Sequence, residues 1–273
     1  MAVIQSTVKA VLRPPYLLVR RFFFALGYFR KPVRDLFRWL FQSREFTNLT
    51  YDLTPRNLNY LAAFVAEVSG KPLAEIHRYI SELMTDDELH QHLSHLAQAA
   101  HDRYGIDSHI KYGRRIGWYA FVRAMKPKVV IETGIDKGLG SCVLAAAARR
   151  NIAEGSTCKI YVTDINPNAG YFIKEPYKQY VNILIGDSIE SLQKLAVEID
   201  LFINDSDHSA EYESKEYEII RNKLSSKALI IGDNSHTTDS LWNFAHASRR
   251  KFLFFKEEPR DHWYQGGGIG ASW

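Results

Sequence analysis

Residues 128–142 read KVVIETGIDKGLGSC, and this stretch decides the fold. A β-branched run ends at Glu132, and glycines at 134, 138 and 140 follow it. Glycines permit a tight turn and a close approach of the backbone to a ligand. The spacing G-x-x-x-G-x-G is neither the dinucleotide fingerprint nor a P-loop. A helix through Ala145–Ala148 comes next. The stretch therefore predicts a strand, a ligand-binding turn and a helix.

Six further short runs, rich in β-branched and aromatic residues, alternate with helical patterns. They lie at 159–164, 181–187, 199–205, 227–233, 251–258 and 267–273. This alternation is typical of a mostly parallel α/β sheet. Each of the first five runs ends in an acidic residue. Because ligands of such sheets bind outside the carboxyl ends of the strands, we expect these acids to converge on one crevice. They are Glu132, Asp164, Asp187, Asp205 and Asp233.

The chain has 273 residues and a net charge of +4, and the charge is uneven. Residues 1–45 hold nine basic residues and two acidic ones, so the pI alone is a weak argument for nucleic acid, which we do not expect as a partner. The stretch Pro32–Gln42 has one apolar and one basic helical face. Three interpretations stay open: a peripheral membrane anchor, a homodimerisation arm, or a helix packed on its own domain.

Two further features concern localisation. No stretch reaches the roughly 18 apolar residues that a spanning helix needs. No signal peptide is recognisable, although the Arg-rich first 34 residues resemble a transit peptide in composition. The two cysteines, Cys142 and Cys158, are expected to be small core residues of a cytoplasmic protein that could lie peripheral to a membrane.

For residues 46–111, the sequence predicts helices that form a lid on the α/β domain or a prelude to it. The first of these helices opens at Thr54 and Pro55 and closes at Gly70, the second starts near Pro72, and the third starts near residue 85. The third carries several histidines without carboxylate neighbours, for which a solvated helix face is a simpler interpretation than a metal site. These histidines are His90, His92, His95 and His101.

Two positions after the second and third strands suit a nucleoside. The ionised carboxylate of Asp164 could accept hydrogen bonds from both hydroxyls of a ribose. Asp187 and Ser188 would then face the base. For each of them, a helix or turn cap is the alternative.

Together these residues resemble the class I S-adenosylmethionine-dependent methyltransferases over residues 112–273. The resemblance implies a Rossmann-like, mostly parallel seven-stranded sheet with an antiparallel last strand and helices on both faces. It also implies that Asp164 holds the ribose of S-adenosylmethionine, and that Asp187 and Ser188 meet the adenine. The residues it implies for the methionine part are Glu132, Gly134, Gly138, Gly140 and Ser141.

The stretch NDSDH at 204–208 resembles the metal-dependent O-methyltransferase branch, which includes catechol, caffeoyl-CoA and macrolide-sugar enzymes. That resemblance implies that Asp205, Asp233 and Asn234 bind Mg²⁺ or another divalent cation. It implies that His208 is the general base, where the catechol enzymes have lysine, so a catechol acceptor is in doubt. Asp207 is expected to cap a turn.

The sequence thus predicts an O-methyltransferase that acts on a small-molecule hydroxyl, with a sugar or secondary metabolite as first choice and a phenolic or lipid-linked hydroxyl as second. One alternative is metal-independent transfer with Asp205 and His208 as base. A non-catalytic, membrane-associated scaffold and a nicotinamide-dependent enzyme are others. His236 is expected in a solvated loop. Four aromatic residues, Trp118, Tyr119, Trp263 and Tyr264, could line an acceptor wall or simply pack.

Overall fold

The computed structural model of this chain describes residues 15–100 and 105–273. These residues form two compact units. The larger unit comprises Arg44–Arg260 and Gly266–Trp273. The smaller one contains the helix before Arg44 together with Asp261–Gln265.

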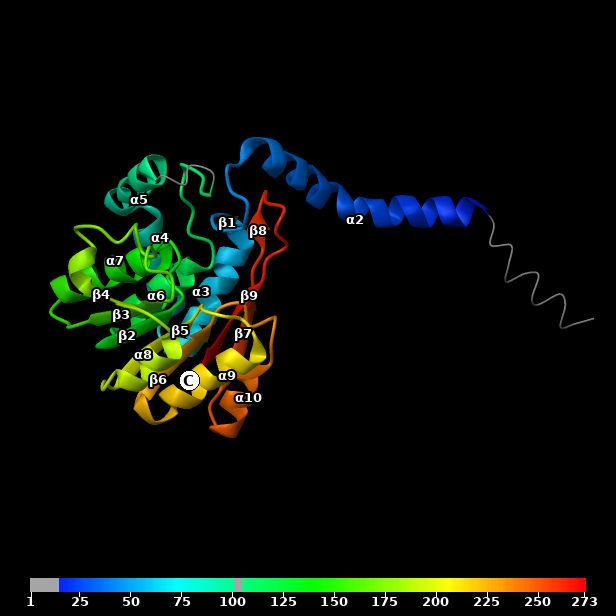
Figure 1. Cartoon of the computed structure of the whole chain (residues 1–273). Coiled ribbons are helices and arrows are strands. Elements are labelled where there is room, and N and C mark those ends of the chain that lie inside the picture. The colour runs from blue at the N-terminus through cyan, green and yellow to red at the C-terminus, as the bar shows by residue number, and fades with distance from the viewer. Residues whose placement is uncertain (1–14, 101–104) are drawn as a thin grey trace, which may run out of the picture. The chain divides into compact units, whose positions relative to one another are not determined.

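A seven-stranded sheet is the centre of the larger unit (Figure 1). Its strand order is β4-β3-β2-β5-β6-β9-β7, and the pairs among β2 to β6 are parallel. The last strand, β9, lies antiparallel between β6 and β7. All seven predicted strands are present, and the predicted antiparallel last strand is confirmed. Their bounds are β2 (Val129–Thr133), β3 (Lys159–Asp164), β4 (Val181–Ile185), β5 (Ile199–Asn204), β6 (Leu224–Gly232), β7 (Phe252–Lys256) and β9 (Gly268–Ser272).

Helices cover both faces of this sheet because alternate strand residues are apolar on both sides. Ile131, Phe202 and Ile230 point to the face covered by α8 (Ser188–Lys194), α9 (Ala210–Ile220) and α10 (Ser240–Ala247). The other face carries α6 (Arg115–Met125) and α7 (Leu139–Ala153), as Figure 1 shows. Cys142 is buried in α7, and both cysteines are free thiols.

Three helices precede α6 in the larger unit, and local signals set their ends. Helix α3 (Pro55–Ser69) begins with Thr54, whose hydroxyl accepts from the Asn57 N–H at 3.2 Å, and ends at Gly70 in a left-handed conformation. Helices α4 (Leu73–Met84) and α5 (Asp87–Ala99) follow. These predicted starts are confirmed. A two-stranded antiparallel sheet of β1 (Asp52–Leu53) and β8 (Pro259–Arg260), which the sequence did not suggest, adjoins α3.

The histidines of α5 are not all solvated as expected. His95 is exposed, whereas the ring nitrogen Nε2 of His92 lies 3.0 Å from the Phe172 carbonyl oxygen and its ring contacts Tyr177. His90 contacts the ring of His109. His101 lies outside the described residues.

Helix α2 (Pro15–Gln42) in the smaller unit is longer than predicted. Pro32, expected to open a helix, lies inside it. Proline removes one backbone hydrogen bond, but the apolar and basic faces continue on both sides of it, and the helix does not end there. Trp39 packs on Trp263 with ring centroids 5.0 Å apart. Among the described residues, no helix is long and apolar enough to cross a membrane.

Candidate active site

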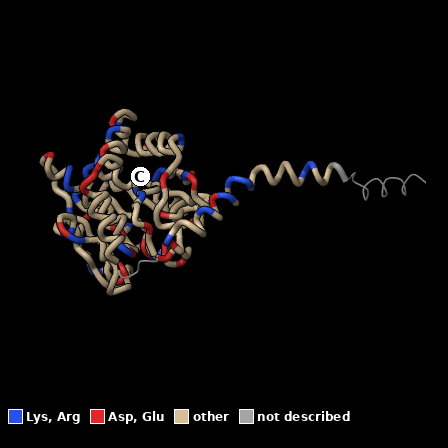
Figure 2. Tube along the Cα trace, turned by 90° about the horizontal axis from the view of Figure 1, so that it is seen from above, with Lys and Arg blue, Asp and Glu red and all other residues tan. Residues whose placement is uncertain are grey.

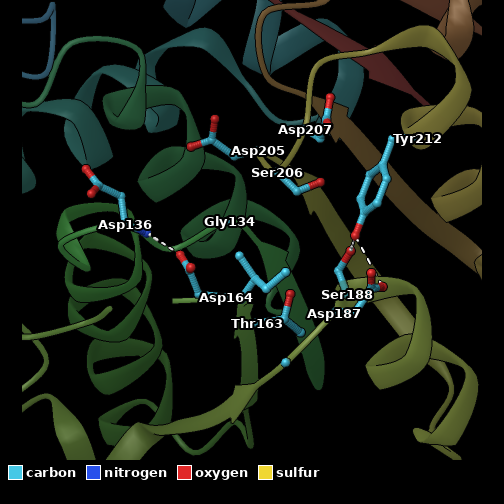
Figure 3. A pocket seen from close by; sticks show the side chains of 12 residues that line it. Gly134, Asp136, Thr163, Asp164, Asp187, Ser188, Asp205, Ser206, Asp207 and Tyr212 are labelled. Atoms are coloured by element: carbon cyan, nitrogen blue, oxygen red, sulfur yellow. Dashed lines mark hydrogen bonds between the residues drawn. The ribbon is translucent and has the colours of Figure 1, made fainter. Parts of the chain in front are cut away.

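A cavity of about 390 Å³ opens at the carboxyl ends of β2, β3, β4 and β5 (Figure 3). Its volume is in the range of small-molecule sites. Three of the five predicted strand-end acids line it: Asp164, Asp187 and Asp205. Glu132 lines a smaller adjoining cavity with Gly134 and Asp205. The full lining of the main cavity is Gly134, Asp136, Thr163, Asp164, Ile165, Gly186, Asp187, Ser188, Asp205, Ser206, Asp207 and Tyr212.

The glycine turn after β2 packs closely against the end of β5 and against Glu132. Gly134 has φ +80°, and a Cβ there would lie 2.1 Å from the Asp205 carbonyl oxygen. A Cβ at Gly140 would lie 2.3 Å from the Glu132 carboxylate. Any larger residue would therefore push the turn away from β5 or displace Glu132.

Asp164 ties the end of β3 to that turn. One carboxylate oxygen, Oδ2, accepts from the Asp136 N–H at 2.9 Å, and the other, Oδ1, accepts from the Asn166 N–H at 2.8 Å. Each oxygen has a second acceptor position, so the group can still bind a diol. The next residue, Ile165, is 77% exposed at the cavity and offers an apolar surface.

Asp187 caps a helix, which was the alternative to its contact with the base of a nucleoside. Its Oδ1 accepts from the Ile189 N–H at 2.7 Å at the start of α8, and the Tyr212 hydroxyl lies 3.3 Å from it. Ser188 is buried, with its hydroxyl 2.9 Å from that of Tyr212. Both residues still line the cavity, so their contact with a base stays a prediction.

A buried carboxylate that sequence reasoning missed, Glu216 of α9, joins the strand ends beneath the cavity. It accepts from the Thr133 hydroxyl at 3.1 Å and from the Ser206 hydroxyl at 2.9 Å. Ser188 and the Asn204 side-chain amide also donate to it. Burial raises the pKa of Glu216, although these four donors oppose the rise. The carboxylate fixes the ends of β2 and β5 relative to α8.

Glu132 lies at the floor of the smaller cavity. It is 1% exposed, and the Ser141 hydroxyl donates to it at 2.5 Å. Burial raises the pKa of Glu132 to about 8, and the Ser141 hydrogen bond opposes this. A cationic ligand group in this cavity would favour the ionised carboxylate.

Asp205, His208 and Asp233 form a cluster after β5 and β6. One ligand atom of each lies within 4.8 Å of the others, as a shared cation would require. His208 Nε2 is 3.6 Å from Asp205 Oδ1, and Nδ1 is 3.5 Å from Glu213 Oε1. The Asn234 side-chain nitrogen lies 3.1 Å from His208 Nε2. The four residues expected around the metal and the base are therefore neighbours.

The charges of this cluster perturb its acids and its imidazole in different directions. Burial and the Asp233 charge raise the pKa of Asp205. Burial also opposes ionisation of Asp233, but Arg114 outweighs it and lowers the pKa of Asp233. Burial disfavours protonated His208, yet the nearby carboxylates of Asp205 and Glu213 outweigh it and raise the pKa of His208 to about 10. At that pKa, His208 is protonated at neutral pH.

Arg114 is the second residue that sequence reasoning missed. Its Nε and Nη2 donate to the two oxygens of Asp233, which is fully buried and lines neither cavity. Its Nη1 donates to the Tyr51 hydroxyl at 2.8 Å. That hydroxyl donates to Glu257 at 2.9 Å. Each Asp233 oxygen keeps one acceptor position, but a cation there would lie close to a guanidinium.

The remaining predicted residues have structural roles. Asp207 is exposed, and its Oδ1 accepts from the Ser209 N–H at 2.7 Å in the turn before α9. His236 is exposed in the turn after β6, away from the main cavity, which confirms the expected solvated loop. Trp118 and Tyr119 are fully buried in α6, so the interpretation of these two as an acceptor wall is wrong. Packing on all sides of α6 accounts for their burial, since every residue from Arg115 to Ala124 is buried.

Comparisons with known proteins found similar chains among the methyltransferases. Residues 131–235 match a family described as a methyltransferase domain. A crystal structure of cofactor-bound Rv0187 from MTB is similar, with a TM-score of 0.52, 16% identity, and coverage of 70% of this chain and 92% of that one. An O-methyltransferase from Bacillus cereus in complex with SAH has a TM-score of 0.50 and 17% identity, with coverage of 71% and 95%. A search of curated proteins found no match.

The likeness to the O-methyltransferase from Bacillus cereus shows that the mostly parallel seven-stranded sheet is a Rossmann-like methyltransferase fold. The family match over residues 131–235 confirms the predicted resemblance to the class I S-adenosylmethionine-dependent methyltransferases.

Proposed function

We propose that this chain is an S-adenosylmethionine-dependent O-methyltransferase that acts on a small-molecule hydroxyl with the help of Mg²⁺ or a similar divalent cation. The observation that carries the proposal is the cluster of Asp205, His208 and Asp233. Asp205 of this cluster lines the same cavity as Asp164. A sugar or secondary-metabolite hydroxyl is the first choice of acceptor, because His208 stands where catechol enzymes have lysine. A phenolic or lipid-linked hydroxyl is the second.

The cavity fits the cofactor by its donors and acceptors. When bound, S-adenosylmethionine supplies an electrophilic methyl group on a sulfonium. The carboxylate of Asp164 would accept from the ribose hydroxyls, and the exposed Ile165 side chain would cover one face of the adenine. Glu132, at the floor of the adjoining cavity, would accept from the cationic amino group of the methionine part.

The cluster fits a hard divalent cation by its chemistry. Carboxylate and amide oxygens are the donors that Mg²⁺ prefers, and Asp205, Asp233 and Asn234 provide them. A bound cation lowers the pKa of a hydroxyl and fixes its orientation. The Asn234 amide would have to turn its oxygen toward the cation, because its nitrogen now faces His208.

His208 would accept the proton of the acceptor hydroxyl. A base must be neutral to do so, whereas the carboxylates of Asp205, Glu213 and Asp233 raise the pKa of this imidazole and keep it protonated in the chain alone. Positive charge beside Asp205 and Asp233 would oppose their part of this effect and lower the pKa of His208. The proposed base therefore depends on the positive charge brought by the ligands of the same site.

A second candidate is metal-independent transfer, and the Arg114–Asp233 ion pair favours it. The guanidinium already neutralises Asp233 and takes one acceptor position on each of its oxygens. In this candidate, Asp205 and His208 act together as the base, and Asn234 only holds its loop, with its side-chain nitrogen 3.1 Å from His208 Nε2. Arg114 then has the electrostatic role that a cation has in the first candidate.

Turnover in the presence and absence of chelator separates the two candidates. The assay follows methyl transfer from labelled S-adenosylmethionine to a panel of sugar and phenolic hydroxyl compounds. The first candidate predicts that EDTA abolishes transfer and that Mg²⁺ restores it. Transfer that persists in EDTA supports the second candidate. A protein that binds no S-adenosylmethionine in calorimetry is neither, and would instead be a non-catalytic scaffold with this fold.

A further inference from the structure

The apolar face of α2 has no partner in its own unit. Ten large apolar side chains of this helix are exposed on one side, among them Phe22, Phe29, Phe37 and Phe41. At 3.6 residues per turn, the ten fall within an arc of about 140°. We call this arc the apolar face of α2.

The segment Asp261–Gln265 covers a different side of the helix. Trp39 packs on Trp263, and Asp35 is buried near them, bonded to Lys31 at 2.8 Å. On a helical projection, Asp35 and Trp39 both lie outside the apolar face. The packing of α2 on this segment therefore leaves the apolar face exposed among the described residues.

Charge indicates what kind of surface the apolar face meets. The helix has six basic residues and one acid, and that acid is buried and paired with Lys31 and Arg34. Figure 2 shows Lys and Arg recurring along α2. On a helical projection, Arg30 and Arg34 lie at one edge of the apolar face, Arg20, Lys31 and Arg38 lie farther round on the same side, and Arg21 lies beyond the other edge. Long basic side chains at such edges can reach lipid phosphates while the apolar side chains insert.

We infer that α2 lies in the surface of an anionic membrane and anchors the enzyme there. Aromatic and aliphatic side chains on one face, with arginines at its edges, are typical of interfacial helices. A helix of 28 residues is about 42 Å long, so it would contact many lipids along its length. The charges along the helix agree with the finding that it is not apolar enough to cross a membrane.

The inference is tested with the full chain and vesicles of stated composition. We expect co-sedimentation with equimolar phosphatidylcholine and phosphatidylglycerol, and little with phosphatidylcholine alone. Raising the salt from about 0.1 M to about 1 M shortens the Debye length from about 10 Å to about 3 Å and should weaken binding. Equal binding to both vesicles, or none to either, would overturn the inference.

A matched pair of variants tests the face itself. Phe22→Ser with Phe29→Ser removes two exposed aromatics from the apolar face and should lower vesicle partitioning on the order of 100-fold. Phe24→Ser with Tyr28→Ser removes two equally exposed aromatics outside it and should change partitioning far less. Equal effects of the two pairs would contradict the inference.

Two further measurements distinguish a membrane from the other possible partners of the apolar face, which are a second copy of the chain and the chain's own domain. If α2 were a dimerisation arm, the parent chain would be dimeric by light scattering without vesicles, and the Phe22 and Phe29 pair would make it monomeric. If the face packed on its own domain, the same pair would lower the midpoint of thermal unfolding. Either result, together with unchanged vesicle partitioning, overturns the membrane assignment. Binding of S-adenosylmethionine is independent of all these readouts, so the proposed function can fail separately.

Discussion

Asp164→Asn tests the cofactor assignment with little change in side-chain volume. The substitution removes the charge and replaces one of two acceptor oxygens by a donor. Loss of charge-assisted hydrogen bonds to a ribose should cost about 1–3 kcal/mol of binding free energy. At about 1.4 kcal/mol per factor of ten, the dissociation constant should rise about 5- to 150-fold. Both backbone N–H groups bound to Asp164 are exposed to water, so we expect only a small effect on folding.

Titration calorimetry with S-adenosylhomocysteine measures this change without an acceptor. Asp207→Asn is the matched control, because Asp207 lines the same cavity and loses the same charge, but its carboxylate serves the turn at Ser209. The control should keep its affinity within about twofold, since exposed charges are well screened. An unchanged affinity in Asp164→Asn, or equal losses in the two variants, would refute the ribose assignment.

Three further predictions concern the base, the buried acid and the ion pair. His208→Gln should lower the maximal rate roughly 10²–10⁴-fold and flatten the acidic limb of the pH–rate profile, and a variant that keeps both would exclude the base. Glu132 has a pKa of about 8 in the folded chain against an ordinary 4.5, so the folded state holds a proton that the unfolded state releases between these values. The free energy of unfolding should therefore fall as the pH rises from about 4.5 to about 8. Urea unfolding at several pH values should show a smaller fall for Glu132→Gln, and an equal fall would disprove the buried, protonated acid. Arg114→Gln leaves the buried Asp233 without its cation and should lower the free energy of unfolding by about 3–5 kcal/mol, whereas a loss under about 1 kcal/mol would show that the pair is not buried as described.

Local chemistry explains why much of the fold was predictable. Thr54, Pro55 and Gly70 set the ends of α3 through capping and left-handed geometry, which need no distant residue. The strands could be predicted equally well, since parallel strands that are buried on both faces have continuous β-branched runs in the sequence. The acids that follow them meet at one edge because all the parallel strands end there.

Arg114 and Glu216 show what the sequence could not reveal. Arg114 meets Asp233 across 119 positions of sequence, so no short pattern connects them. One weak signal existed, because the basic pair at the start of α6, Arg114 and Arg115, opposes the helix dipole and implies a compensating acid. Glu216 lies in a stretch of α9 rich in acids, and only the packing of α9 against the strand ends singles it out.

The most direct test of the central claim is the binding of Mn²⁺, a paramagnetic substitute for Mg²⁺, measured by electron paramagnetic resonance on the full chain loaded with S-adenosylhomocysteine. The proposed site predicts one bound ion per chain, lost in Asp205→Asn and retained in Asp207→Asn, since only Asp205 belongs to the cluster with Asp233. Failure of the loaded parent chain to bind Mn²⁺, or binding that Asp205→Asn leaves unchanged, would contradict the metal-assisted mechanism.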